Sequence, residues 1–390
     1  MTRRFVMGVN KCRACGGNFH KNSLLELNNM PKAAQHMPDK KSIRTDKGIH
    51  LEVKQCAACG LIQLDNEPVK YYRDVIRATS VSGEMKAFRE KQFWSFIRKN
   101  GLSGKKILEI GCGKGDYLSI MDKAGVKALG IENNPASVDY CKKSGLKAIK
   151  GFVAGPSYKI KGAPFDGFFM MSFLEHLPDL RGVMAGIRNN LKDGACGLVE
   201  VPNFDMMLKK KLYAELIIDH LFYFTRNTLT TFLSNNGFEV IGCSAVWHDY
   251  ILSTVVRKKV SVSMDDASAY FSELKMEIND YVDSFRKKGK SVAIWGAGHQ
   301  AFMVMSVCGL KGKIEYVVDS APFKQGKYTP ATHIPIVGPE TLVKKPVNAI
   351  IIMAGSYSRE ICGLISKKHK QVRDYVMLEN SKLINGKNLK

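Results

Sequence analysis

The sequence predicts an α/β protein with a small metal-binding module ahead of two units that each form a parallel sheet. Two Cys-x-x-Cys pairs near the amino terminus predict the module, and two separate stretches of alternating short apolar strands and helices predict the sheets. The length of 390 residues agrees, since about 150 residues per domain allow two or three domains. The composition, 45% hydrophobic and 24% charged, excludes a disordered or collagen-like chain.

The two cysteine pairs predict a zinc-binding module over residues 1–70. Each pair is followed directly by glycine, which permits the left-handed turn of a metal-binding knuckle. Four thiolates complete a tetrahedron and leave no open position, so we expect structural Zn²⁺ rather than a catalytic ion. Two redox pairs or four independent buried cysteines are the alternatives. The predicted ligands are Cys12, Cys15, Cys56 and Cys59.

The rest of the chain divides by its hydrophobic pattern. Apolar residues at helical spacing predict a helical connector over residues 71–104. The central unit spans residues 105–260, and its expected strands are 106–110, 128–131, 166–171 and 197–201. A polar helical stretch at 264–288 opens the carboxy-terminal unit, residues 261–390, whose expected strands are 291–295, 314–318 and 349–353.

A glycine-rich turn follows the first strand of the central unit, in Ile-Leu-Glu-Ile-Gly-Cys-Gly-Lys-Gly-Asp (107–116). Glycines there let the backbone approach a bound ligand and expose the amides of the following helix. Taken alone, the turn is weak evidence for any one cofactor, because enzymes that bind dinucleotides use similar glycine spacing. Glu132 makes the prediction of a ribose-containing ligand more specific, because it ends the second strand with a carboxylate suited to two ribose hydroxyls. The third strand ends at Ser172 and runs into Leu-Glu-His-Leu-Pro-Asp (174–179).

At these motifs the chain resembles the class I S-adenosylmethionine-dependent methyltransferases. The Glu-x-Gly-Cys-Gly-x-Gly form is more specific than a plain dinucleotide-type glycine turn. The resemblance implies a Rossmann-like domain in which the glycine turn lies beside the methionine part of the cofactor and Glu132 holds the ribose. The residues assigned to S-adenosylmethionine are Glu109, Gly111, Gly113, Gly115, Glu132 and Ser172.

Further motifs resemble the zinc-containing sugar C-methyltransferases, which act on nucleotide-linked 4-keto-deoxysugars. These motifs are Glu-Val-Pro-Asn (200–203) and Asp-His-Leu-Phe-Tyr-Phe-Thr (219–225), with the cysteine knuckles in front and a second Rossmann-like unit behind. In that family an acid–histidine pair before Tyr-Phe holds the catalytic base, which implies Asp219 and His220 here. The family's tyrosine three residues before the histidine is Ile217 in this chain, so the exact chemistry stays open.

His220 also has a rationale in elementary chemistry. Methylating carbon requires removal of a proton, and a proton beside a ketone is acidic enough for an imidazole at neutral pH. An adjacent acid such as Asp219 can orient the ring or raise its basicity. The competing interpretation is a core or capping histidine in an otherwise apolar stretch.

The carboxy-terminal unit opens with Val-Ala-Ile-Trp-Gly-Ala-Gly-His (292–299), a strand and a glycine turn. Asp319 follows its second strand as in dinucleotide-binding domains, but the turn lacks a third glycine. We therefore expect a nucleotide-sugar or structural domain rather than an independent NAD site. Lys324 has two interpretations: it contacts the diphosphate of such a ligand, or it is a solvated surface lysine.

The formal charge of +23 favours anionic ligands. The lysines and arginines are scattered without interleaved aromatics, which disfavours nucleic acid and favours a small anionic substrate such as a nucleotide-sugar. Methylation at oxygen or nitrogen, or an RNA-binding or RNA-modifying function, are the alternatives. Without a signal-peptide-like or membrane-length apolar stretch, we expect a cytoplasmic protein. The sequence leaves its oligomeric state open.

Overall fold

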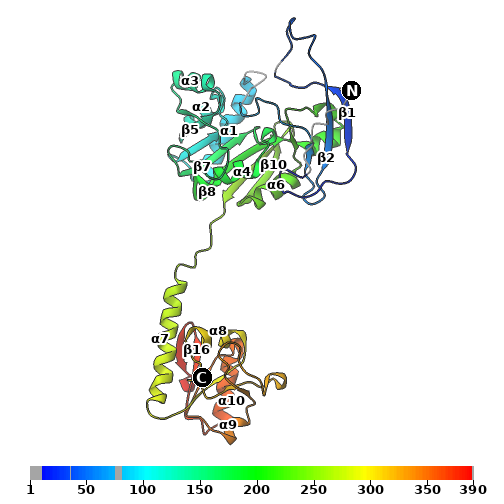
Figure 1. The fold of residues 1–390 in the computed structure, drawn as a ribbon. Coiled ribbons are helices and arrows are strands. Elements are labelled where there is room, and N and C mark those ends of the chain that lie inside the picture. The colour runs from blue at the N-terminus through cyan, green and yellow to red at the C-terminus, as the bar shows by residue number, and fades with distance from the viewer. Residues whose placement is uncertain (1–10, 36, 75–80, 389–390) are drawn as a thin grey trace. The chain divides into compact units, whose positions relative to one another are not determined.

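The computed structural model describes residues 11–35, 37–74 and 81–388 of the chain (Figure 1). The chain divides into two compact units, residues 1–261 and 262–390, and each is described by itself. The boundaries at residues 70, 104 and 260 remain sequence predictions. Within the described ranges, no helix has both the length and the apolar character that crossing a membrane requires.

The first unit is built on a seven-stranded sheet with the order β10-β11-β8-β7-β4-β5-β6. Strands β4 to β8 are parallel, and β11 and β10 extend the sheet in antiparallel fashion. Their bounds are β4 (Lys106–Ile110), β5 (Lys127–Glu132), β6 (Ala148–Lys150), β7 (Phe165–Met171), β8 (Leu191–Pro202), β10 (Phe238–Val246) and β11 (Ile251–Lys258). The strand order reverses between β4 and β7, and ligands of open α/β sheets bind beside such a switch point.

Helices cover both faces of this sheet. Buried side chains of α1, α2 and α3 pack on one face, and those of α4 and α6 pack on the other. The helices are α1 (Gly83–Lys99), α2 (Asp116–Lys123), α3 (Pro135–Lys143), α4 (Leu180–Asn189), α5 (Phe204–Lys210) and α6 (Arg226–Asn235). The apolar stripe predicted between residues 71 and 104 is the buried face of α1, where Phe93 packs against Phe169 of β7 with ring centroids 5.6 Å apart. Residues 75–80 of that stretch lie outside the described residues.

A second, four-stranded sheet joins the cysteine-bearing segment to the central unit. Its order is β1-β2-β3-β9, with bounds β1 (Leu25–Met30), β2 (Ile49–Gln55), β3 (Ile62–Leu64) and β9 (Phe222–Tyr223). Ile62 of β3 pairs with Tyr223 of β9, and the Leu64 N–H donates to the Leu221 carbonyl at 2.9 Å. The amino-terminal segment therefore holds the stretch that directly follows Asp219 and His220.

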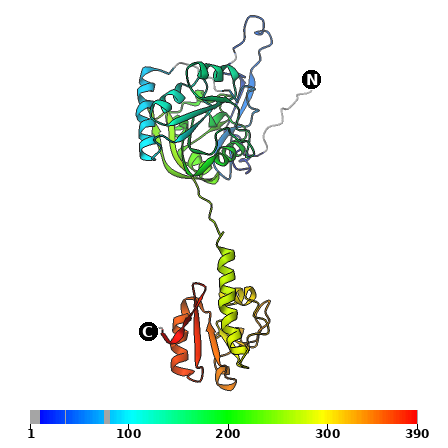
Figure 2. The same cartoon turned by 90° about the vertical axis from the view of Figure 1, so that its left-hand side faces the viewer.

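The second unit has a six-stranded sheet with the order β14-β13-β12-β15-β16-β17. The first five strands are parallel, and β17 is antiparallel. The strands are β12 (Val292–Trp295), β13 (Val317–Val318), β14 (Ile336–Val337), β15 (Ala349–Ile352), β16 (Asp374–Glu379) and β17 (Lys382–Asn385). Helices α7 (Ala267–Arg286) and α8 (His299–Val307) pack on one face, and α9 (Thr341–Lys344) and α10 (Ser358–Lys368) on the other (Figure 2).

Two of the predicted strands differ from the observed ones by more than one residue at an end. The strand expected at 314–318 is reduced to β13. Residues before Val317 make only isolated hydrogen bonds to β12, such as the one from the Glu315 N–H to the Val292 carbonyl at 2.9 Å, and so do not join the regular ladder. The strand expected at 197–201 extends from Leu191 to Pro202, with an irregular register against β7 between Leu191 and Cys196.

Candidate active site and cofactor pocket

The glycine turn lies at the carboxyl end of β4 and leads into α2. Gly111, Gly113 and Gly115 have φ angles of 71°, 52° and 84°, which lie in the left-handed region that favours glycine. A Cβ atom on Gly115 would lie 2.6 Å from a Leu146 methyl group and 2.9 Å from the Cys141 sulfur. Both conformation and packing therefore require glycine at this turn.

Glu132 links the turn to the neighbouring strand β5. Its carboxylate accepts hydrogen bonds from the Gly113 N–H at 3.0 Å and the Asn134 N–H at 2.8 Å. Burial raises the pKa of Glu132, while these two N–H donors act in the opposite direction. A carboxylate offers about four lone-pair positions, so two such bonds leave room for hydroxyl donors from a ligand.

A small hollow lies at the carboxyl ends of β4 and β5, beside the switch point of the sheet. Its wall is mainly apolar and backbone. The lining residues are Arg73, Ile110, Gly111, Ile131, Asn133, Gly151, Phe152, Val153, Phe173 and Val183. Apolar walls with a few polar groups are typical of small-molecule sites.

The segment before α1 closes one side of this pocket. The Arg73 guanidinium lies over the Phe152 ring at 5.1 Å and the Tyr72 ring at 5.4 Å. Asn133 donates to the Asp74 carboxylate at 2.6 Å, which ties the same segment to the end of β5. These contacts have no signal in the sequence, since no local pattern connects this segment to residues 133 and 152.

The structure places the predicted cofactor residues along one edge of the sheet. Gly111 lines the pocket, and Gly113 and Glu132 are bonded to each other. Glu109 is buried within β4. Ser172 is exposed at the end of β7 with φ of 50°, and its N–H donates to the Glu200 carbonyl at 2.9 Å. Their roles toward a cofactor remain predictions.

Asp219 is a structural anchor in this fold. Its carboxylate accepts from the Tyr71 hydroxyl at 2.6 Å and the Ala34 N–H at 2.9 Å. Burial, followed by the bond to Asp219, raises the pKa of Tyr71 to about 12, so its hydroxyl remains a donor. Within the described residues no hydrogen bond joins this carboxylate to the His220 ring, so the structure differs from the expectation that Asp219 polarises the imidazole.

His220 instead lies against a second histidine and a buried acid. Its ring meets that of His176 edge to face, with centroids 4.8 Å apart. Glu175 is 1% exposed, and neither of its carboxylate oxygens has a hydrogen-bond partner in the described part of the chain. Burial raises the pKa of Glu175 to about 8, whereas burial and then His176 lower the pKa of His220 to about 3. His220 is therefore a neutral imidazole at neutral pH.

Ile217 occupies the position of the family's tyrosine, and its backbone has a different tyrosine partner. Its N–H donates to the Tyr223 hydroxyl oxygen at 2.8 Å, and its carbonyl accepts from that hydroxyl at 3.1 Å. Tyr223 thus fixes the chain just before Asp219 and His220 without supplying a hydroxyl from position 217.

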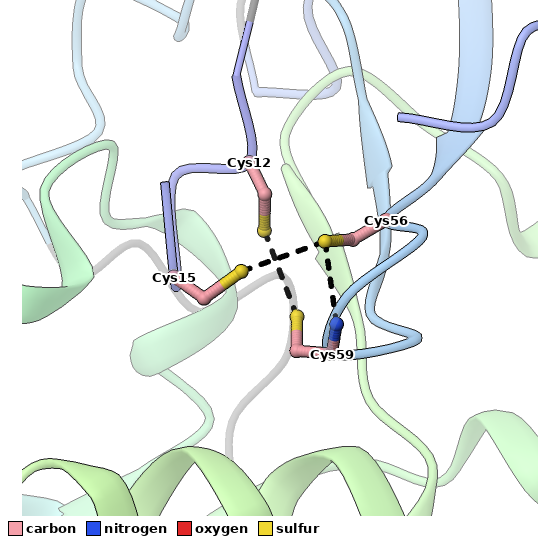
Figure 3. Close-up of side chains that lie close together, drawn as sticks. All are labelled: Cys12, Cys15, Cys56 and Cys59. Atoms are coloured by element: carbon pink, nitrogen blue, oxygen red, sulfur yellow. Dashed lines mark hydrogen bonds between the residues drawn. The ribbon is translucent and has the colours of Figure 1, made fainter. Parts of the chain in front are cut away.

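The four predicted zinc ligands converge on one point (Figure 3). The sulfur atoms of Cys12 and Cys59 are 3.8 Å apart, and those of Cys15 and Cys56 are 3.5 Å apart. Zn–S bonds of about 2.3 Å in a tetrahedron require sulfur separations of about 3.8 Å. The Gly17 N–H also donates to the Cys15 sulfur at 3.3 Å, as expected in a metal-binding knuckle.

In the second unit the dinucleotide-type acid is satisfied within the protein. The Asp319 carboxylate accepts from the N–H groups of Ala297 at 2.8 Å and Ala321 at 2.9 Å. Lys324 pairs with the same carboxylate at 2.8 Å. The role of this unit toward a nucleotide-sugar remains a prediction.

Comparison with known proteins places these features in a family context. A methyltransferase-domain model matches residues 83–242, and a model described as the C-methyltransferase C-terminal domain matches residues 264–377. The chain is 23% identical to the C-methyltransferase NovU of Streptomyces niveus, over 91% of this chain and 92% of that protein. The chain is an S-adenosylmethionine-dependent methyltransferase. The glycine turn lies within the residues matched by the methyltransferase-domain model, and the predicted α/β fold with two Rossmann-like units is confirmed.

Other similarities are more limited in extent. The chain is 31% identical to the ubiquinone biosynthesis O-methyltransferase of Methylococcus capsulatus over 31% of this chain and 52% of that protein. An S-adenosylmethionine-dependent methyltransferase structure from Clostridium acetobutylicum covers 44% of this chain and 92% of its own, with 10% identity and a TM-score of 0.38.

Proposed function

We propose that this methyltransferase transfers a methyl group to a carbon atom of a nucleotide-linked keto-sugar, with His220 as the general base. The observation that carries the proposal is the place of the His220 ring, which lies edge to face against His176 with centroids 4.8 Å apart and without a ring hydrogen bond to the described residues. Its lone pair is therefore available to take a proton from a bound substrate. The match of residues 264–377 to the C-methyltransferase C-terminal domain supports carbon as the acceptor.

We expect S-adenosylmethionine to bind at the ends of β4 and β5. The left-handed glycines permit close approach of a ligand, the wall offers apolar contact to a purine, and Glu132 keeps lone pairs for ribose hydroxyls. When bound, this cofactor supplies a methyl group on a positively charged sulfur. Gly111, Gly113 and Glu132 are the residues that we expect to hold it.

The residues around His220 then prepare the acceptor. Its imidazole takes the proton from the carbon beside the ketone, and the C–H electron pair becomes available to form the new carbon–methyl bond. Holding donor and acceptor in line supplies much of the rate. Tyr71 and the Ala34 N–H fix Asp219 and thereby the position of the adjacent His220.

We also propose that the four cysteines hold a structural zinc ion. Two sulfur separations of 3.5 and 3.8 Å support it, because a tetrahedral zinc ion requires about 3.8 Å, and all four sulfurs lie within 4.8 Å of one another. The ion would fix the knuckles that carry β3, and β3 in turn pairs with β9.

A second candidate is methylation at oxygen or nitrogen of a sugar. Ile217 favours it, because a hydroxyl from that position is missing from the acceptor site. In that reaction the acceptor loses a proton from O–H or N–H, and no ketone is needed.

A panel of nucleotide-sugars tests the two candidates. We expect mass spectrometry to show one added methyl group on 4-keto-sugars and none on the matched sugars whose ketone is reduced to an alcohol. Equal methylation of the reduced sugars would contradict the carbon assignment and favour oxygen or nitrogen.

Glu132→Ala tests the cofactor assignment. We expect it to weaken S-adenosylmethionine binding by about 1.5–3 kcal/mol, the scale of a hydrogen bond to a charged group, which is about tenfold or more in affinity. Calorimetry measures this, with the exposed Glu239→Ala as the matched control. The zinc content and far-ultraviolet circular dichroism should be unchanged. Equal affinity in variant and parent would show that the carboxylate does not bind the ribose.

A further inference from the structure

Glu175, His176 and His220 bring two imidazoles and one carboxylate together outside the cysteine cluster. One donor atom from each lies within 4.8 Å of the other two. Two histidines and one carboxylate are a set that binds divalent transition metals and leaves further coordination positions open. Metal bonds of about 2.0–2.2 Å place the donor atoms of a tetrahedral site about 3.4 Å apart. Side-chain rotations that shift the donor atoms by little more than 1 Å would therefore complete the site.

His176 is already oriented as metal-binding histidines are. Its Nδ1 lies 2.7 Å from the Asp219 carbonyl oxygen, and since a carbonyl only accepts, Nδ1 carries the proton. The lone pair is therefore on Nε2. A backbone carbonyl that fixes the tautomer in this way is the usual outer partner of a metal-bound imidazole. The carboxylate of the same Asp219 is held by Tyr71 and Ala34.

Glu175 supplies the second, independent indication of a ligand. Its carboxyl group is buried, and both oxygens are without a partner in the described chain, which is rare because such burial costs free energy. A proton could neutralise it, but only a metal ion would also use the two adjacent imidazoles. Both histidines are partly exposed to solvent as residues.

We propose that Glu175, His176 and His220 form a second metal site, which binds a divalent transition-metal ion and, when occupied, blocks His220 as a base. The ion takes the imidazole lone pair that would otherwise receive the substrate proton, so binding and proton abstraction exclude each other. The inhibition rests on the proposed function, whereas the binding does not. The N and O donors also distinguish this site from the four sulfur donors of the cysteine cluster.

Cobalt titration of the zinc-loaded protein tests the binding. We expect one Co²⁺ per chain beyond the resident zinc, with visible d–d absorption and without the sulfur-to-cobalt charge-transfer bands of a cysteine site. Glu175→Gln and His176→Gln should each weaken this second equivalent at least about tenfold, a scale set by loss of even outer metal partners. The exposed His248→Gln is the matched control and should bind like the parent. Circular dichroism checks that each variant is folded.

Two outcomes would overturn the site. One is a zinc-loaded parent that takes up no further cobalt, and the other is a Glu175→Gln variant that binds it as tightly as the parent. With binding established, turnover should fall in proportion to occupancy and return when a chelator removes the cobalt. Turnover that is constant or rises with occupancy would overturn the blocking of His220. Because the cobalt spectrum needs no substrate, an error in the proposed sugar reaction leaves the binding result intact.

Discussion

Replacing His220 with alanine should lower turnover by about 10²–10⁴-fold, the usual contribution of a positioned base, while cofactor and substrate affinities stay close to parental. The reason is that the imidazole acts on the reacting proton, which contributes little to ground-state binding. Steady-state kinetics and calorimetry on the same preparations separate the two effects. The exposed His248→Ala serves as the matched control.

Proton exchange gives this variant a sharper readout. In deuterated buffer, with a non-methylating cofactor analogue, the parent should exchange the proton beside the ketone, and His220→Ala should not. Asp219→Asn should retain part of the exchange, since the imidazole is still present while its anchoring through Tyr71 and Ala34 is weakened. A His220→Ala variant with near-parental turnover would make His220 structural, and methylation at oxygen or nitrogen would become the favoured reaction.

Removing one zinc ligand should have the largest effect on stability. Cys56→Ser is expected to lose the metal and unfold the cysteine knuckles, because structural zinc in small modules contributes about 10–16 kcal/mol of binding free energy that is also folding free energy. Since β3 pairs with β9, hydrogen exchange should also increase at residues 219–223. Metal analysis and hydrogen-exchange mass spectrometry measure these changes.

Cys243→Ser is the control for this experiment, since Cys243 is half-buried and lies outside the cluster. It should keep one zinc per chain and parental exchange at residues 219–223. A metal-free parent that is fully folded, with four titratable thiols at the predicted ligand positions, would contradict the zinc assignment.

Features fixed by local sequence were predicted well. The strand expected at 106–110 matches β4, because an apolar run bounded by lysine and glycine defines both ends. The cysteine cluster also converges as the spacing indicated, since each Cys-x-x-Cys-Gly knuckle is set by a few neighbouring residues. β13 was overestimated, because apolar residues before Val317 are buried without joining a regular ladder.

Features that depend on distant contacts could not be predicted. Tyr71 and Asp219 are 148 positions apart, and only the folded chain shows that this acid binds the tyrosine rather than the His220 ring. Glu175 belongs to a recognised motif, but its burial without a partner depends on the packing of several segments. The left-handed conformation of Ser172 likewise has no local signal, because serine seldom adopts it.

The most direct test of the proposed reaction is the carbon nuclear magnetic resonance spectrum of the product made with S-adenosylmethionine labelled by ¹³C in its methyl group. Transfer to the carbon beside the ketone gives a methyl signal in the aliphatic C–CH₃ region, with a one-bond carbon–carbon coupling when the sugar is also labelled. We expect that signal from a 4-keto nucleotide-sugar. A methoxy or N-methyl signal without that coupling would contradict carbon methylation and the role of His220 as its base.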